Sequence, residues 1–201
     1  MSGTRAPRDL VLASSSPYRR ELLNRLGLSF AWAAPAIDET QLADEQPETL
    51  VRRLALAKAR ALGDQYRHAL LIGSDQVAVI DTQVLGKPGN RARAIEQLRA
   101  AAGCEVVFLT SLCLLDAQTG EHRIEVVPTM VRFRALGEAQ LAAYVDREQP
   151  YDCAGSFKAE GLGIALFESI RSDDPTALIG LPLIALTRLL AAAGVDVLSS
   201  A

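Results

Sequence analysis

The sequence is poor in the residues that build disulfide frameworks, metal clusters and histidine-based catalytic sites. Its 201 residues include three cysteines and two histidines. Cys104, Cys113 and Cys153 show no CxxC spacing, and an odd, scattered set disfavours disulfides and zinc sites and fits a reducing compartment. His68 and His122 lie far apart with no motif around them. Any chemistry should therefore depend on carboxylates, lysines and arginines.

Long apolar runs and an excess of basic charge are also absent. A membrane-spanning helix needs about 20 apolar residues, and the longest predominantly apolar stretch, 178–195, is interrupted by Pro182 and Arg188. The N-terminus has basic residues before a very short apolar run, which predicts no secretory signal. The net charge of −3 disfavours nucleic-acid or membrane-surface binding. We expect a cytoplasmic protein with no membrane and no nucleic-acid partner.

Several common templates for nucleotide and acyl chemistry are missing as well. The sequence has no GxxxxGK[ST], no GxGxxG after a predicted strand and no GxSxG, which excludes the P-loop, the dinucleotide fingerprint and the nucleophile elbow. With 49% hydrophobic and 22% charged residues, the composition is that of a globular protein. No repeat or low-complexity linker divides it, so residues 1–201 predict a single domain.

Short apolar runs alternate with helical patterns along the chain. Two pairs of runs, 77–80 with 83–85 and 105–115 with 122–133, predict hairpins. The mixture predicts an α/β or α+β fold with a twisted mixed β-sheet flanked by helices, and Trp32 is assigned to its core. Strands are predicted at 10–13, 30–34, 70–73, 77–80, 83–85, 105–115, 122–133 and 164–167, and helices at 17–26, 47–62, 91–102, 136–147 and 182–193.

Segment 14–20, with the sequence SSSPYRR, joins a predicted strand to a predicted helix. The free N–H groups at a helix start attract anions. Hydroxyl groups and two arginines, Arg19 and Arg20, stand beside them, and guanidinium binds phosphate oxygens bidentately. The segment therefore predicts a phosphate site, although a capped helix with solvated arginines fits the same residues.

Carboxylates follow two other predicted strands. Asp75 stands in the segment 73–76, GSDQ, at a strand end, where it can bind a divalent cation or activate a water. An Asx turn or a helix cap fits it equally well. Asp38 and Glu39 lie in an acidic loop and face solvent unless that loop folds against Asp75, in which case they form a metal site.

Lys58, Lys87 and Lys158 are the only lysines in a chain where arginine dominates. Lys58 lies at the polar edge of an apolar helix face, and the other two lie in loops of small residues. Scarce point charges in such loops suit phosphate contacts. Three solubilising surface lysines are an equally good interpretation of each residue taken alone.

Taken together, these segments resemble the Maf family in order and spacing from about residue 10 to residue 193. The resemblance implies a nucleoside triphosphate pyrophosphatase that uses a divalent cation, Mg²⁺ or Mn²⁺, and releases the monophosphate and pyrophosphate. It also implies two lobes around a central cleft, kinship with the inosine-triphosphate pyrophosphatases, and a homodimer. The matching segments are 12–23, 37–39, 58–59, 73–76, 86–88 and 154–157, with 178–182 similar to the family's closing motif.

The resemblance assigns roles to individual residues. Asp75 is the expected general base and, with Glu39, the expected metal ligand. Tyr18, Gln76 and Glu160 stand at three positions that set the subfamily, and this set resembles the subfamily acting on 7-methyl-GTP. The other residues expected to bind substrate are Ser14, Arg19, Arg20, Lys58, Lys87 and Lys158.

The methylated base explains these residue types physically, because N7 methylation leaves a cationic purine ring. Tyr18 would stack on that ring, and Glu160 would accept hydrogen bonds from the guanine N1–H and amino groups. Gln76 would orient a base edge or the attacking water.

The expected reaction is attack on the α-phosphorus by a water held by Asp75 and the metal, with the basic side chains holding the departing pyrophosphate. A non-catalytic nucleotide-binding regulator of cell division would use the same phosphate cradle. The presence of both Asp75 and Lys87 favours catalysis, because binding alone needs no base. A nucleic-acid-binding module is the third alternative, and the slight acidity and the lack of an aromatic and basic stripe disfavour it.

Overall fold

The computed structural model describes residues 8–199. Within them lies one mixed seven-stranded sheet of order β2-β1-β3-β5-β6-β7, with β4 paired to β3. Its strands are β1 (Leu10–Ala13), β2 (Ala31–Ala33), β3 (Leu70–Ile80), β4 (Gln83–Leu85), β5 (Glu105–Asp116), β6 (His122–Phe133) and β7 (Phe167–Ser172). β1 pairs in parallel with β2 and β3, and the other pairings are antiparallel.

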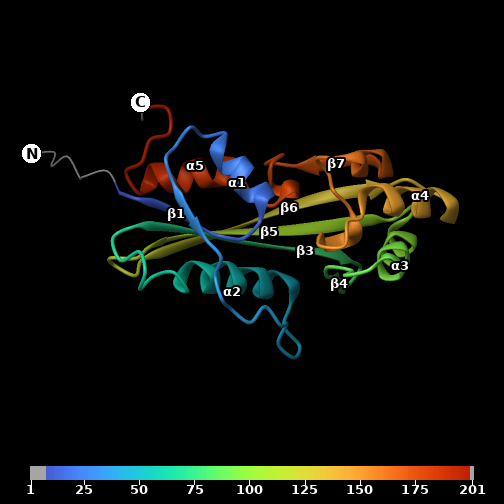
Figure 1. Cartoon of the computed structure of the whole chain (residues 1–201), viewed down its shortest axis with the longest axis horizontal. Helices are drawn as coiled ribbons and strands as arrows, with labels where there is room; N and C mark the ends of the chain where they lie inside the picture. Colours follow the sequence, from blue (N-terminus) through green and yellow to red (C-terminus); the bar gives the residue numbers. More distant parts are fainter. Residues whose placement is uncertain (1–7, 200–201) are drawn as a thin grey trace, which may run out of the picture.

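Helices cover this sheet, which confirms the predicted α/β fold. Short 3₁₀ turns at Ala154–Ser156, Leu162–Leu166 and Ala177–Ile179 complete the chain. In Figure 1, α2 lies below the long strands, α1 and α5 lie above them, and α3 and α4 gather at the far end. The helices are α1 (Pro17–Asn24), α2 (Pro47–Arg60), α3 (Arg91–Ala101), α4 (Glu138–Glu148) and α5 (Leu183–Ala192).

β1 separates two hydrophobic cores at one end of the sheet. Leu10 and Leu12 pack in the cluster that contains residues of α1 and α5. Val11 and Ala13 pack in the cluster that contains residues of α2. Successive side chains of a strand point to opposite faces, so a strand covered on both faces must be apolar throughout.

A separate core fills the other end of the sheet, between α3, α4 and the distal halves of the long strands. Phe157 belongs to this core and packs edge-on against Phe108 and Phe133, with ring centroids 5.0 and 6.0 Å away. Such edge-to-face pairs are a preferred aromatic arrangement. β3, β5 and β6 run through both ends (Figure 1). The end that carries α1, α2 and α5 and the end that carries α3 and α4 are therefore two lobes built on one sheet.

β3 is a single continuous strand, so the predicted break between 70–73 and 77–80 is wrong. Asp75 and its neighbours stay in the ladder and pair with β5. Their polar side chains find partners: the Ser74 hydroxyl donates to the Ser111 carbonyl, and the Gln76 amide donates to the Thr110 hydroxyl. Buried polar groups that are hydrogen-bonded are tolerated inside a sheet.

The last strand is also displaced from its predicted position at 164–167. Residues Leu162–Leu166 form a 3₁₀ turn, and the strand follows at Phe167–Ser172. This strand lies at the edge of the sheet and is largely exposed. An edge strand facing water carries polar residues, so its sequence lacks the apolar run on which the prediction depended.

The assignment of Trp32 to the core is wrong. Its side chain is 48% exposed, on the edge strand β2. The guanidinium of Arg20 lies over the ring, 4.0 Å from its centroid, which is a cation–π contact.

No helix within residues 8–199 is long and apolar enough to cross a bilayer. The prediction about a secretory signal concerns an N-terminus of which residues 1–7 lie outside the described part. One domain over 1–201 stays a prediction.

α2 approaches β3 more closely than any side chain at the contact would permit. A Cβ atom at Gly73 would lie 2.0 Å from the carbonyl oxygen of Ala55 and 3.0 Å from the amide nitrogen of Ala59. A glycine is therefore required where the helix crosses the strand, two residues before Asp75.

We expect Gly73→Ala to lower the free energy of unfolding by about 1–3 kcal/mol, because overpacking against a backbone forces the helix outward. Urea denaturation measures this change. Gly86→Ala is the matched control, since a Cβ there would meet nothing within 4 Å. Equal stability of the two variants would contradict the close packing of α2 on β3.

Candidate active site

A cavity of about 710 Å³ lies between the two lobes. Its walls come from segments that are distant in the sequence, and nearly all the residues predicted for the site are among them. The first part of the chain contributes residues 14–19, Glu39, Lys58 on α2, residues 75–77 on β3, Val84, Gly86 and Lys87. The later part contributes Asp152, Cys153, Ala154, Phe157, Ala159, Glu160 and residues 178–180.

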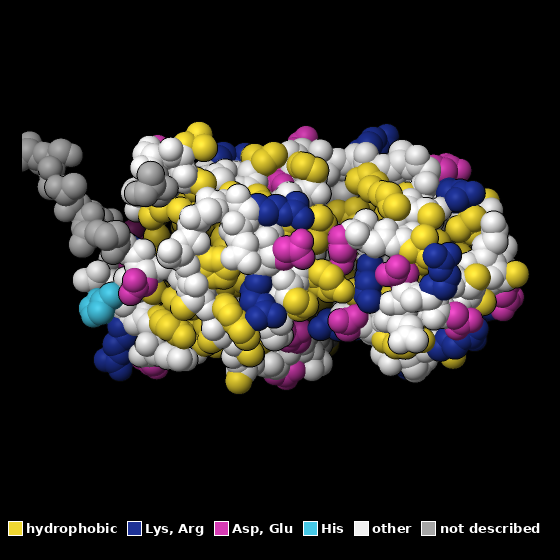
Figure 2. All heavy atoms as spheres, turned by 45° about the horizontal axis from the view of Figure 1, so that its top comes forward, with side chains coloured by type: hydrophobic (Ala, Val, Ile, Leu, Met, Phe, Trp, Pro, Cys, Tyr) yellow, Lys and Arg dark blue, Asp and Glu magenta, His cyan; other side chains and the backbone are white. Residues whose placement is uncertain are grey.

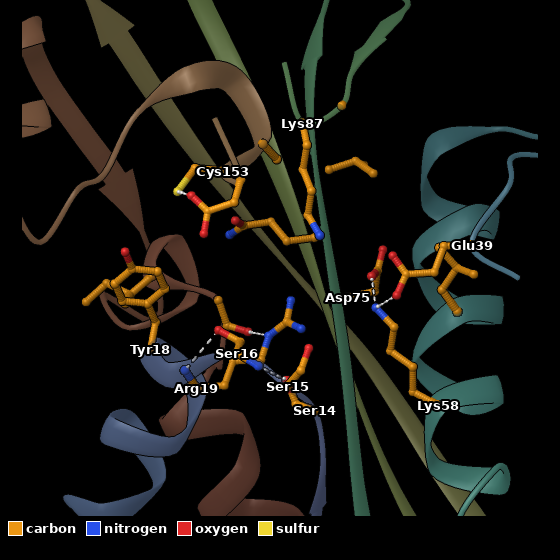
Figure 3. Close-up of a pocket in the computed structure, with 18 of the residues that line it drawn as sticks. Ser14, Ser15, Ser16, Tyr18, Arg19, Glu39, Lys58, Asp75, Lys87 and Cys153 are labelled. Atoms are coloured by element: carbon orange, nitrogen blue, oxygen red, sulfur yellow. Dashed lines mark hydrogen bonds and ion pairs between the residues drawn. The ribbon is translucent and has the colours of Figure 1, made fainter. Parts of the chain in front are cut away.

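The serine-rich turn holds Arg19 at one wall of the cavity (Figure 3). The Ser16 hydroxyl caps α1 by accepting from the backbone N–H of Arg19, and the Ser14 hydroxyl accepts from the N–H of Ser16. The Nε of Arg19 donates to the carbonyl of Gly180 over 2.8 Å, and the Ser74 hydroxyl donates to the same oxygen over 2.9 Å. The closing motif thus fixes the Arg19 side chain.

Lys58 lies between two carboxylates on the opposite wall. Its Nζ is 2.6 Å from Oδ1 of Asp75 and 2.9 Å from Oε1 of Glu39. Figure 3 shows Lys58 reaching from α2 towards Asp75 on β3 and Glu39 on its loop. Lys58 and Asp75 are buried, and burying opposite charges as a bonded pair avoids leaving either one uncompensated.

The surrounding charges keep Glu39 ionised. Burial alone would raise the pKa of Glu39, but the hydrogen bond from Lys58 and the charges of Lys58, Lys87 and Arg19 outweigh it, and the pKa is lowered. Burial lowers the pKa of Arg19, against the attraction of Asp75 and Glu39. All three basic groups line the same cavity.

Lys87 completes this basic end, and its side chain extends into the middle of the cavity in Figure 3. Together with Arg19 and Lys58 it presents positive charge from three different elements. Such an arrangement binds phosphate oxygens.

The other end of the cavity is acidic and aromatic. Burial first, and then the neighbouring ionisable groups of Cys153, Glu160 and Asp152, raise the pKa of Tyr18 to about 12. Tyr18 therefore stays a neutral phenol. Burial also raises the pKa of Glu160, and burial with the nearby Asp152 raises that of Cys153 to about 12.

Gln76 lines the cavity, but its amide group is committed to the wall. The Nε2 atom lies within hydrogen-bond distance of Thr110 Oγ1 and of the carbonyl oxygens of Ala177 and Leu178. In this structure Gln76 therefore supports the segment that precedes Gly180.

Two predicted binding residues are not among those that line the cavity. Arg20 lies on the outer side of α1, against Trp32. Lys158 donates from Nζ to the carbonyl oxygen of Glu148 at the end of α4 over 2.9 Å, and its backbone N–H donates to the hydroxyl of Tyr144.

Sequence reasoning did not select Asp152, Cys153 and Phe157 individually, although all three line the cavity. Phe157 belongs to the matching segment 154–157, whereas Asp152 and Cys153 stand before it in a stretch with no periodic pattern, so no local signal marked those two. Gly180 belongs to the closing motif and has a φ of 124°, and only its place in that motif pointed to the site.

Asp75 and Glu39 are the residues that would hold the expected divalent cation. Their carboxylate oxygens converge on one point, now occupied by the Lys58 ammonium, and hard cations prefer oxygen ligands. Within residues 8–199 no group of three or more His, Cys, Asp or Glu side chains is placed to hold a metal. A cation here would need oxygens from the substrate, which is how Mg²⁺ usually binds at phosphate sites.

A cavity that is basic at one end and aromatic and acidic at the other defines a site for a small organic polyanion. The chain belongs to the Maf family, because residues 9–193 match the family described as Maf-like protein. It is 60% identical over 193 residues, 96% of this chain and 97% of the relative, to the 7-methyl-GTP pyrophosphatase of Nitrosococcus oceani. Relatives with the same name from Pseudomonas savastanoi pv. phaseolicola and Pseudomonas aeruginosa are 58% and 54% identical, each covering 94% of this chain and 98% of the relative.

Proposed function

We propose that this protein hydrolyses 7-methyl-GTP to 7-methyl-GMP and pyrophosphate. The observation that carries the proposal is the difference in charge between the two ends of the cavity. The basic end suits a triphosphate, and the acidic and aromatic end suits a cationic base. The relatives named 7-methyl-GTP pyrophosphatase support it.

In this proposal Asp75 accepts a proton from the attacking water. The water oxygen bonds to the α-phosphorus, the bond from that phosphorus to the bridging oxygen breaks, and pyrophosphate leaves with the bridging oxygen. Arg19 and Lys87 hold the leaving group. A divalent cation bound by Asp75 and Glu39 would neutralise phosphate charge and polarise the phosphate oxygens.

The base is recognised at the opposite end. The neutral Tyr18 ring stacks on the cationic methylated purine. Glu160 accepts from the guanine N1–H and amino groups, and the neighbouring Asp152 adds negative charge. A neutral pyrimidine offers no positive charge to these groups.

Other features of the chain agree with a nucleotide enzyme of the cytoplasm. Cys104, Cys113 and Cys153 are free thiols, as a reducing compartment requires. On the face shown in Figure 2, acidic and basic side chains are interspersed, whereas nucleic acids select continuous basic surfaces. A homodimer stays a prediction.

A panel of normal and modified nucleoside triphosphates, scored for pyrophosphate release, tests the substrate. We expect 7-methyl-GTP to give the highest kcat/KM. We also expect excess chelator to abolish turnover, because the carboxylates of Asp75 and Glu39 repel the phosphates of the substrate unless a cation lies between them. Binding of 7-methyl-GTP without pyrophosphate release would favour the regulator instead. Full activity in chelator would remove the cation from the reaction.

We expect Asp75→Asn to lower kcat by about 10² or more, because an amide cannot accept the proton from water. Circular dichroism and urea denaturation show whether the variant is folded. Asp38→Asn is the matched control, since the Asp38 carboxylate accepts from the backbone N–H of Thr40 and does not line the cavity. A wild-type rate in folded Asp75→Asn would remove Asp75 from this role.

Glu160→Gln and Tyr18→Arg should each lower the ratio of kcat/KM for 7-methyl-GTP over thymidine triphosphate. A lost charge-assisted hydrogen bond costs about 1.5–3 kcal/mol, so Glu160→Gln should lower the ratio by roughly tenfold or more. Steady-state kinetics with both nucleotides measure it, with the exposed Glu96→Gln on α3 as control. An unchanged ratio in both variants would contradict their contact with the base.

A further inference from the structure

Two loops that face the cavity from different parts of the chain are joined by one side chain of α3. The loop after β4 carries Gly86 and Lys87, and the loop after α4 carries residues 152–157. Gln97 contacts both: its Oε1 accepts from the hydroxyl of Ser156 over 2.5 Å, and its Nε2 donates to the carbonyl oxygen of Gly86 over 3.2 Å.

The turn that Gln97 holds has an unfavourable backbone conformation. Gly155 and Ser156 have φ values of 71° and 63°, and a left-handed conformation is uncommon for serine. Ser156 is fully buried, so its hydroxyl needs an internal partner, which Gln97 supplies. This sharp turn places both Cys153 and Phe157 at the cavity wall.

A backbone contact joins the same two loops farther out. The N–H of Gly89 donates to the carbonyl oxygen of Tyr151 over 2.9 Å. Because this bond uses main-chain atoms of Gly89 and Tyr151 only, a substitution at Gln97 removes neither of its partners. Loss of the Gln97 side chain should therefore change the spacing and orientation of the two walls without separating the loops.

We propose that Gln97 is a positioning residue that sets the distance between the phosphate-binding end and the nucleoside-binding end of the cavity. Lys87 follows the residue bonded to Nε2, and Phe157 follows the residue bonded to Oε1. A nucleoside triphosphate has two parts, a base and a triphosphate. It binds both ends of the cavity at once only when the spacing of the ends matches the distance between its base and its phosphates. The inference rests on the proposed function, because it needs a substrate that spans both ends.

Gln97→Met tests it, because methionine has a similar length and helix propensity but cannot make either hydrogen bond. We expect kcat/KM for 7-methyl-GTP to fall by roughly tenfold or more, since small misplacements of bound groups are costly. The inhibition constants of pyrophosphate and of 7-methyl-GMP, measured separately, should each change by less than about twofold, because each product uses one end only. A rise in the inhibition constant of either product as large as the fall in kcat/KM would overturn the proposal, as would an unchanged kcat/KM.

Two further variants separate positioning from a general loss of structure. Ser156→Ala breaks the same connection from the other loop, so it should reproduce the kinetic effect, and the double variant should be no slower than the slower single variant. Glu96→Met, at the neighbouring exposed position of α3, should keep wild-type kinetics. Additive effects of Gln97→Met and Ser156→Ala would overturn the connection.

Failure of the proposed substrate would be seen in the wild-type protein and is distinct from failure of this inference. If the wild-type protein hydrolysed a different nucleoside triphosphate, the same comparison would be made with that nucleotide, its monophosphate and pyrophosphate. A loss confined to the intact nucleotide would still support the role of Gln97, and equal losses for nucleotide and products would still contradict it.

Discussion

The buried ion pair between Lys58 and Asp75 is the constraint on which the site depends. A charged group in a protein interior is costly unless it is paired, and these two groups come from a helix and a strand that are brought together only by the fold. Gly73 permits the approach, since a Cβ there would collide with the backbone of α2. Glu39 then joins the same ammonium, which fixes the acidic loop at the cavity.

The sequence predicted the chemical types at the site better than their contacts. The turn 14–19, Asp75, Lys58 and Lys87 were selected correctly as residues that lie together, because their motifs occur in the order of a known family. The condition set for the acidic loop is met by Glu39, through Lys58. It is not met by Asp38, whose carboxylate accepts from the N–H of Thr40. Two adjacent loop residues point in different directions, and composition cannot tell which one turns inward.

Arg20 and Lys158, which were predicted to bind substrate, lie outside the cavity lining for physical reasons that the sequence pattern does not reveal. Adjacent helical residues are separated by about 100° around the axis, so Arg19 and Arg20 cannot both face the cavity, and the outer one covers Trp32. Lys158 lies against a carbonyl at the end of α4, where a positive charge is favourable. A scarce lysine in a loop of small residues therefore has a structural use that no pattern distinguishes from a phosphate contact.

The environment of the site also decides which kind of hydrolysis it can support. A covalent intermediate needs an activated nucleophile, and the thiol of Cys153 is held protonated by burial, with its pKa raised to about 12. The hydroxyls of Ser14 and Ser16 accept backbone N–H groups as caps, and neither His68 nor His122 is among the lining residues that could act as a base for them. The carboxylates of Asp75 and Glu39, both bonded to Lys58, are the groups beside the basic side chains that can accept a proton, and the proposed reaction uses Asp75. The geometry therefore supports direct displacement by water rather than a covalent phosphoryl-enzyme or nucleotidyl-enzyme route.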